Sequence, residues 1–128
     1  MKSRRDIPAR VRILNETRQT LLADHADVAA TARARRTGLL RRASLKPGEG
    51  LWIVPCEAVH SFGMKFAIDL VYIDRKKRVR KIRSAMIPRR LSACLTAHSV
   101  LELPSGTIAS STTRTGDRLQ FEFIDLPN

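Results

Sequence analysis

Two carboxylates stand inside apolar runs that have the length of β-strands. Asp69 lies within residues 66–73, and Glu102 lies within residues 100–103. A carboxylate buried in such a strand needs an ionic or hydrogen-bonding partner, and Arg42 and His60 are of suitable type. We expect either a structural network, in which the carboxylates bind backbone N–H groups or an arginine, or a ligand pocket. The candidate ligand-binding residues are Arg41, Arg42, His60, Met64, Asp69 and Glu102.

The same region carries side chains of the kind that bind a soft metal. Cys56, His60 and Met64 recur at every fourth residue, and a thiolate, an imidazole and a thioether together suit Cu(I). Four-residue spacing aligns side chains only on a helix, whereas Pro55 and Gly63 predict a loop here. We therefore expect Cys56 and Met64 to be packing residues, and we expect no metal or other cofactor.

Positive charge concentrates between positions 75 and 90, which hold nine of the 24 Lys and Arg residues and no Asp or Glu. A strand pair with this charge is able to follow a nucleic-acid backbone. Aromatic residues make up only 5% of the chain, so no base-stacking platform is predicted. The alternatives are a solvated basic surface and non-specific nucleic-acid or anion binding. The nine residues are Arg75, Lys76, Lys77, Arg78, Arg80, Lys81, Arg83, Arg89 and Arg90.

The sequence lacks the signatures of common enzyme classes. Residues 110–113 supply hydroxyls, but they form no GxSxG or SxxK motif, and we predict a surface loop there. Gly48 and Gly50 build neither a P-loop nor a dinucleotide fingerprint. General acid–base catalysis also needs a nucleophile or substrate geometry that no residue pattern here specifies. A small enzyme of unknown reaction is therefore the third function class, behind two binding functions.

The 128 residues are 43% apolar and 28% charged, which is typical of one folded domain. The formal charge of +12 favours anionic partners. Two separated cysteines, Cys56 and Cys94, argue against a disulfide-rich scaffold. The sequence contains neither an apolar run long enough to span a membrane nor a secretory signal. We expect a cytoplasmic protein with a basic arm at residues 1–9 and a single domain at residues 10–128.

The elements that must position these residues are mostly short strands. Residues 10–13 and 20–23 predict a hairpin, and further strands are predicted at 51–54, 66–73, 78–83, 100–103 and 119–124. Residues 24–36 predict the main helix, with Asp24 or Asp27 as its N-cap and Gly38 as its stop. This pattern is typical of a strand-dominated α+β domain, a small curved sheet or barrel-like structure with one main helix.

Seven segments occur in an order and spacing that are shared with a known family. They are residues 37–42 (TGLLRR), 50–56 (GLWIVPC), 60–69 (HSFGMKFAID), 71–74 (VYID), 88–89 (PR), 100–106 (VLELPSG) and 115–119 (TGDRL). From Ile13 onward the chain resembles the prokaryotic domain of unknown function 192. The resemblance implies a small strand-rich domain and carries over no agreed activity. Relatives often replace Cys56 and His60, which argues against a shared metal site, and often have Asp-Gly in place of Lys76 and Lys77.

Together these features favour a non-enzymatic binding or accessory domain. We expect a shallow polar groove near His60, Met64, Asp69 and Glu102 that recognises a small ligand or a protein segment. The alternative is non-specific nucleic-acid or anion binding through residues 75–90. A catalytic function would gain support if His60 lay within hydrogen-bond distance of Asp69 or Glu102.

Overall fold

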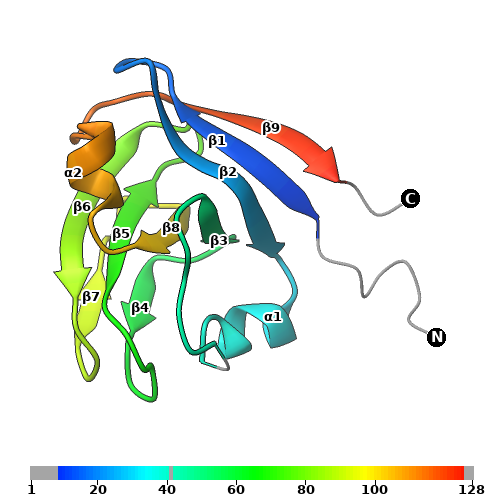
Figure 1. Cartoon of the computed structure of the whole chain (residues 1–128), viewed down its shortest axis with the longest axis vertical. Helices are drawn as coiled ribbons and strands as arrows, with labels where there is room; N and C mark the ends of the chain where they lie inside the picture. The colour runs from blue at the N-terminus through cyan, green and yellow to red at the C-terminus, as the bar shows by residue number, and fades with distance from the viewer. Residues whose placement is uncertain (1–8, 41, 126–128) are drawn as a thin grey trace.

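The computed structural model describes residues 9–40 and 42–125, which form nine strands and two short helices (Figure 1). The strands are β1 (Arg10–Asn15), β2 (Thr20–Ala29), β3 (Glu49–Ile53), β4 (Ala58–His60), β5 (Ile68–Ile73), β6 (Val79–Met86), β7 (Leu91–Ala93), β8 (Ser99–Pro104) and β9 (Leu119–Asp125). The helices are α1 (Ala32–Thr37) and α2 (Thr107–Ser111). The predicted strand-dominated α+β class is confirmed, with two short helices in place of one main helix. No helix of the described residues is long and apolar enough to cross a membrane.

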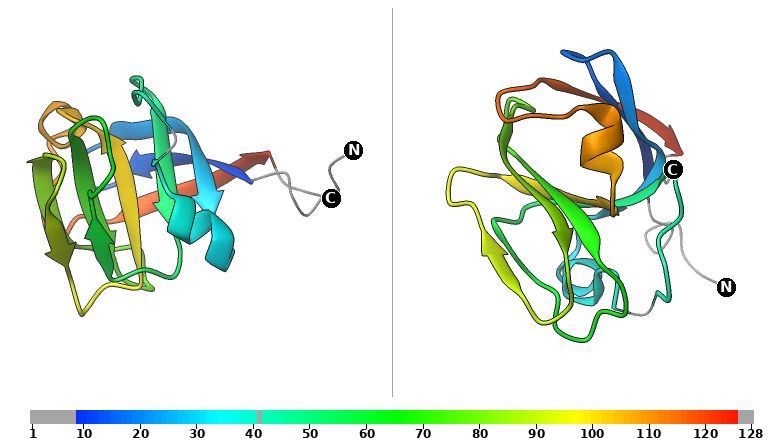
Figure 2. Two further views of the ribbon diagram at one scale, coloured as in Figure 1. Left: turned by 90° about the horizontal axis from the view of Figure 1, so that it is seen from below. Right: turned by 60° about the vertical axis from the view of Figure 1, so that its left-hand side comes forward.

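Seven of the strands form one mixed sheet in the order β6-β5-β8-β3-β2-β1-β9, and β4 pairs with β7 in a separate two-stranded ribbon. The sheet curves strongly, which brings its two edge strands towards each other (Figure 2). One isolated β-bridge, between Arg78 and Arg118, connects the chain just before β6 with the chain just before β9. Within the described residues the ladder is not continuous around the sheet, so the structure is a curved open sheet and not a closed barrel.

Every residue of β5 is buried, because β6 and β8 flank it and apolar side chains cover both its faces. Alternate residues of a strand point to opposite faces. Val71 therefore packs in the cluster that contains Ile108 of α2, whereas Leu70 packs in the cluster that contains Leu39 and Met64. The second cluster is the floor on which the candidate site is built.

The helix predicted for residues 24–36 is wrong over most of its length. β2 continues to Ala29 because it pairs with β1 on one side and with β3 on the other. Ala26 and Ala29 are buried in this pairing. The helix propensity of alanine is a weak preference, and strand pairing of this extent overrides it.

The helix that does form has a different cap from the one predicted. The Thr31 hydroxyl accepts a hydrogen bond from the Ala34 N–H at 3.1 Å, so neither Asp24 nor Asp27 caps α1. The stop at Gly38 is confirmed, since its N–H donates to the Ala34 carbonyl and its φ is +49°. α1 therefore ends with Arg35 and Arg36 in its last turn.

The surface loop predicted at residues 110–113 is wrong in part: Ser110 and Thr112 are exposed, but Ser110 and Ser111 belong to α2. α2 ends at Ser111, and the hydroxyls of Ser111 and Thr113 are buried and lie 2.7 Å apart. Thr113 also accepts a hydrogen bond from the Asn15 side chain at 3.1 Å, and Asn15 donates to Asp117 at 2.9 Å. These hydroxyls fix the end of α2 to β1, a role that needs residues about a hundred positions away in the chain.

The loop expected around residues 56–64 contains β4, which pairs with β7 through three residues on each strand. Three residues offer too little periodicity for a strand to be predicted. The predicted basic arm, residues 1–9, falls outside the described residues except for Ala9. Ala9 accepts a hydrogen bond from the Val28 N–H at 3.0 Å, so it belongs with the folded domain.

Candidate functional site

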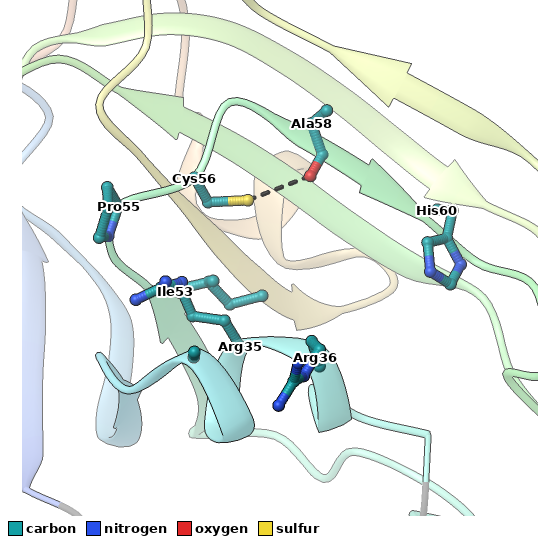
Figure 3. Close-up of a pocket in the computed structure, with 8 residues that line it drawn as sticks. Arg35, Arg36, Ile53, Pro55, Cys56, Ala58 and His60 are labelled. Atoms are coloured by element: carbon teal, nitrogen blue, oxygen red, sulfur yellow. Dashed lines mark hydrogen bonds between the residues drawn. The ribbon is translucent and has the colours of Figure 1, made fainter.

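A groove of about 560 Å³ lies between α1 and β4 (Figure 3). α1 supplies Arg35 and Arg36 on one side, and the facing segment supplies Cys56, Ala58 and His60 on the other. The groove continues into a narrower pocket of about 90 Å³, which shares these five residues with it and reaches Glu102. We call the two hollows together the α1–β4 groove.

Short-range and long-range hydrogen bonds hold the two walls in place. The Thr31 cap and the Gly38 stop fix the ends of α1. On the other wall, the Val54 N–H donates to the Ala29 carbonyl at 3.1 Å, and the Cys56 N–H donates to the His98 carbonyl at 2.8 Å. The chain then enters β4, whose pairing with β7 sets the positions of Ala58 and His60.

Glu102 projects from β8, a central strand paired with both β3 and β5, and lines the narrow pocket with Met64. Its residue surface is only 3% exposed. Gly38 faces the same pocket, and a Cβ atom at position 38 would lie 4.0 Å from the Glu102 carboxyl oxygen Oε1. The positive φ at position 38 favours glycine, so the chain conformation itself keeps the space over this carboxyl open.

The Glu102 carboxyl is buried without a partner among the described residues. Burial raises its pKa from the ordinary 4.5 to about 7, and no charge or hydrogen bond in the described structure offsets that rise. Both protonation states are therefore populated near neutral pH. The group is able to donate a hydrogen bond in one state and to accept hydrogen bonds in the other.

Arg42 is not the partner of either predicted carboxylate, which corrects our expectation. Its guanidinium donates to Asp27 at 2.7 Å and lies 3.7 Å from Glu49. Asp27 also lies 3.6 Å from Arg10. This network ties β1, β2 and the start of β3 together, outside the groove.

Asp69 has a structural role, which is one of the two alternatives that the sequence left open. It is fully buried, and its two carboxylate oxygens accept backbone N–H groups from Ala85 at 2.8 Å, Gly106 at 3.1 Å and Ile108 at 2.8 Å. These donors come from β6, from the turn before α2 and from α2. Asp69 therefore joins three elements and does not line the groove.

Cys56 and His60 line the groove without forming a catalytic pair. Burial raises the pKa of the Cys56 thiol, and the nearby Glu102 adds to this rise, while the thiol donates to the Ala58 carbonyl at 3.1 Å. His60 is exposed, with its ring 5.9 Å from that of Phe62. In the described part of the chain, no hydrogen bond joins His60 to Asp69 or Glu102, and no cluster of three or more His, Cys, Asp or Glu side chains could hold a metal ion.

The structure brings together three of the six predicted ligand-binding residues: His60, Met64 and Glu102. Asp69 and Arg42 have the separate partners described above, and Arg41 lies outside the described residues. Sequence reasoning misses Arg35 and Arg36 as groove residues, because it assigns them only to the C-terminal end of the predicted helix and to a basic cluster able to extend a nucleic-acid contact. No local pattern could have found them, because their place in a groove depends on the segment that lies opposite α1.

The basic residues between positions 75 and 90 divide into two groups. Three are half-buried: Lys77 lies over the Trp52 ring at 5.1 Å, Lys81 donates to the Ala93 carbonyl, and Arg83 donates to the Leu91 carbonyl. The other six are exposed: Arg75, Lys76, Arg78, Arg80, Arg89 and Arg90. Among these, Arg78 donates to the Gly116 carbonyl at 3.3 Å, Arg80 to the Thr96 hydroxyl at 3.4 Å and Arg90 to the Arg89 carbonyl at 3.2 Å.

The fold and the groove define a small single-domain protein with a strand-rich α+β structure and a hollow at one side of its sheet. The chain belongs to the DUF192 family, described as "Uncharacterized ACR", whose family model matches residues 13–121. No curated protein matches the chain.

Two solved structures share this fold. One, from Sinorhizobium meliloti and described as a proposed transcription regulator, has a TM-score of 0.75 and 20% identity over 90% of this chain and 94% of its own. The other, a protein of unknown function from Novosphingobium aromaticivorans, has a TM-score of 0.72 and 18% identity over 88% and 84%. At these identities the similarity shows the fold alone.

Proposed function

We propose that this chain is a binding domain whose α1–β4 groove recognises a small ligand or a chain segment that carries an anionic group. The observation that carries the proposal is the pairing of a cationic rim with an unpartnered carboxyl. Arg36 is exposed and makes no ion pair among the described residues, and Arg35 uses one nitrogen to donate to the Ala30 carbonyl at 2.8 Å. Guanidinium groups bind carboxylates and phosphates through paired hydrogen bonds.

The character of the groove supports recognition over catalysis. A nucleophilic thiol needs a lowered pKa, whereas the pKa of Cys56 is raised. The walls add apolar area from Ile53, Pro55 and Met64, and ligand sites commonly combine such walls with a few polar groups. Glu102 is placed to exchange a hydrogen bond with a ligand that enters the narrow pocket.

We expect the dicarboxylate succinate to bind in this groove, with Arg36→Ala weakening the binding by about tenfold through loss of a charged contact. The measurement is an NMR titration of the ¹⁵N-labelled protein, in which the amides of Gly38, Ala58 and His60 should shift together. Arg114→Ala is the matched control, because it removes the same charge from an exposed position beyond α2. Shifts confined to other surfaces, or equal weakening by both variants, would contradict the proposal.

Non-specific binding of a nucleic-acid backbone is a second candidate function. It is favoured by the six exposed cations of β6 and its flanking turns, of which only Arg80 approaches an acidic side chain, Asp74 at 3.9 Å, within the described residues. β6 is an edge strand, so one side of this basic row faces no other strand of the large sheet. Backbone binding requires only that such charges reach phosphates.

For this second candidate we expect the affinity for a fluorescent random-sequence DNA duplex to fall steeply with added salt. If four phosphates are contacted, the slope of log K against log salt is about −4, and Lys76→Ala should reduce its magnitude by about 1. Fluorescence anisotropy across a salt series measures both. Binding that is absent at low salt, or independent of salt, would exclude this function.

A further inference from the structure

We propose that the natural occupant of the α1–β4 groove is an extended peptide segment with an acidic side chain, which adds a strand to the open edge of β4. The inference rests on the proposed function and names the class of its ligand. Three observations carry it: the direction of the β4 backbone groups, the contrast between the two edges of the β4–β7 ribbon, and the charges across the groove.

The register of the ribbon determines which backbone groups of β4 face the groove. The Cys94 N–H donates to the Glu57 carbonyl at 2.8 Å, and the Ser61 N–H donates to the Arg90 carbonyl at 2.9 Å. Hydrogen-bonded pairs alternate with non-hydrogen-bonded pairs in an antiparallel ladder. The N–H and C=O groups of Ala58 and His60 therefore point away from β7, and both residues line the groove.

The two outer edges of the β4–β7 ribbon differ in the partners of their outward backbone carbonyls. On β7, the outward carbonyls of Leu91 and Ala93 accept side-chain donors from β6, Arg83 at 2.6 Å and Lys81 at 2.7 Å. On β4, the outward carbonyl of Ala58 receives only the weak thiol donor of Cys56, and the other outward groups have no partner among the described residues. An unpaired strand edge of this kind is a template for another strand.

Charge and side-chain alternation specify the chemistry of the added strand. Arg35 and Arg36 line the groove on the side of α1, opposite the residues of β4, so an acidic side chain of the peptide lies within their field. Leu91 stands opposite His60 in the ribbon and is 70% exposed. The peptide residue opposite His60 would lie on the same face of the ribbon as Leu91, because cross-strand neighbours share a face. An apolar side chain at that position would extend this apolar surface. The expected ligand therefore alternates acidic and apolar β-branched residues over about three positions, the length of β4.

The test uses a synthetic peptide, acetyl-Val-Asp-Val-Asp-Val-amide, and the full chain. At saturation we expect hydrogen exchange of the Ala58 and His60 amides to slow by about tenfold or more, while the Val59 amide, already directed at β7, is unchanged. A peptide with lysine in place of aspartate should bind at least about tenfold more weakly. Unchanged exchange at Ala58 and His60 with bound peptide would overturn the inference.

Two N-methylated peptides separate strand addition from side-chain binding without altering the protein. One carries methyl groups on the two aspartate amides and the other on the amides of the central and the C-terminal valine. Since successive amides of a strand point in opposite directions, one isomer should lose about tenfold or more in affinity and the other should retain it. Equal affinity of the two isomers would overturn the inference.

A protein variant offers an independent check. Ala58→Pro removes an outward N–H of β4, and Ala93→Pro removes the corresponding outward N–H of β7. We expect only Ala58→Pro to weaken peptide binding, with thermal melting used to confirm that both variants fold. If succinate binds in the groove and the peptide does not, strand addition is wrong and the proposed function stands. If neither binds there, both are wrong.

Discussion

Asp69→Asn is expected to lower the free energy of unfolding by about 3 kcal/mol, because it disrupts a fully buried carboxylate that accepts three backbone N–H groups. One oxygen accepts from Ala85, and the other accepts from Gly106 and Ile108. Asparagine keeps one acceptor oxygen and replaces the other by a donor. Either orientation of the amide sets an NH₂ group against at least one N–H and leaves a buried donor without a partner.

The position of these donors explains why the cost is large. Ala85 has a φ of +50°, and the β5–β6 register shifts between Ile68 and Leu70, so its N–H has left the regular ladder. Gly106 and Ile108 stand at the start of α2, where helical N–H groups lack partners within the helix. One carboxylate thus satisfies groups that no other described side chain reaches.

Urea denaturation of the wild type and the variant measures the difference. Glu122→Gln is the control, since Glu122 is only half-buried and lies 3.6 Å from the exposed Arg12; we expect it to cost about 0.5 kcal/mol or less. A loss below about 1 kcal/mol for Asp69→Asn would show that the three N–H groups find other partners.

The burial of Asp69 and Glu102 was predictable, but the division of their roles was not. Both residues interrupt apolar runs, and both are buried as expected. The donors to Asp69 lie 16, 37 and 39 positions away, so only the tertiary fold reveals that this carboxylate is satisfied. Glu102 has the same local pattern and ends up facing a pocket. Local sequence carries no information on that difference.

In the fold prediction, too, the correct parts depend on the local sequence pattern, and the incorrect part depends on contacts between distant residues. The long strands β5, β8 and β9 carry their own apolar pattern and were located from it. Most of the residues in the expected helix, 24–36, do not form it, because β2 pairs with β3. β3 begins twenty residues after the end of β2, so this pairing is not visible in the local sequence. Arg35 and Arg36 became groove residues only because β4, itself too short to predict, lies opposite them.

Between pH 4 and pH 8 the stability of Glu102→Gln relative to the wild type is expected to rise by roughly 3 kcal/mol, because the variant lacks the buried, unpartnered carboxyl group that ionises in this range. The pKa of Glu102 is raised in the folded state from the ordinary 4.5 to about 7. Between these values the folded chain holds a proton that the unfolded chain has released. Stability from this group is therefore greatest at and below pH 4.5, falls as the pH rises towards 7, and is lost above it.

The decisive measurement is the difference in unfolding free energy between variant and wild type at several pH values from 4 to 8, since the contributions of other groups then cancel. The difference should rise with pH through this window and level off above about pH 7. Glu122→Gln is the control for the change of side chain itself, because Glu122 is not enclosed in the core. A flat profile for Glu102→Gln would mean that a partner neutralises the carboxylate in solution. Glu102 would then not be an unpaired buried charge, and its burial would no longer be evidence for a ligand that binds at the narrow end of the groove.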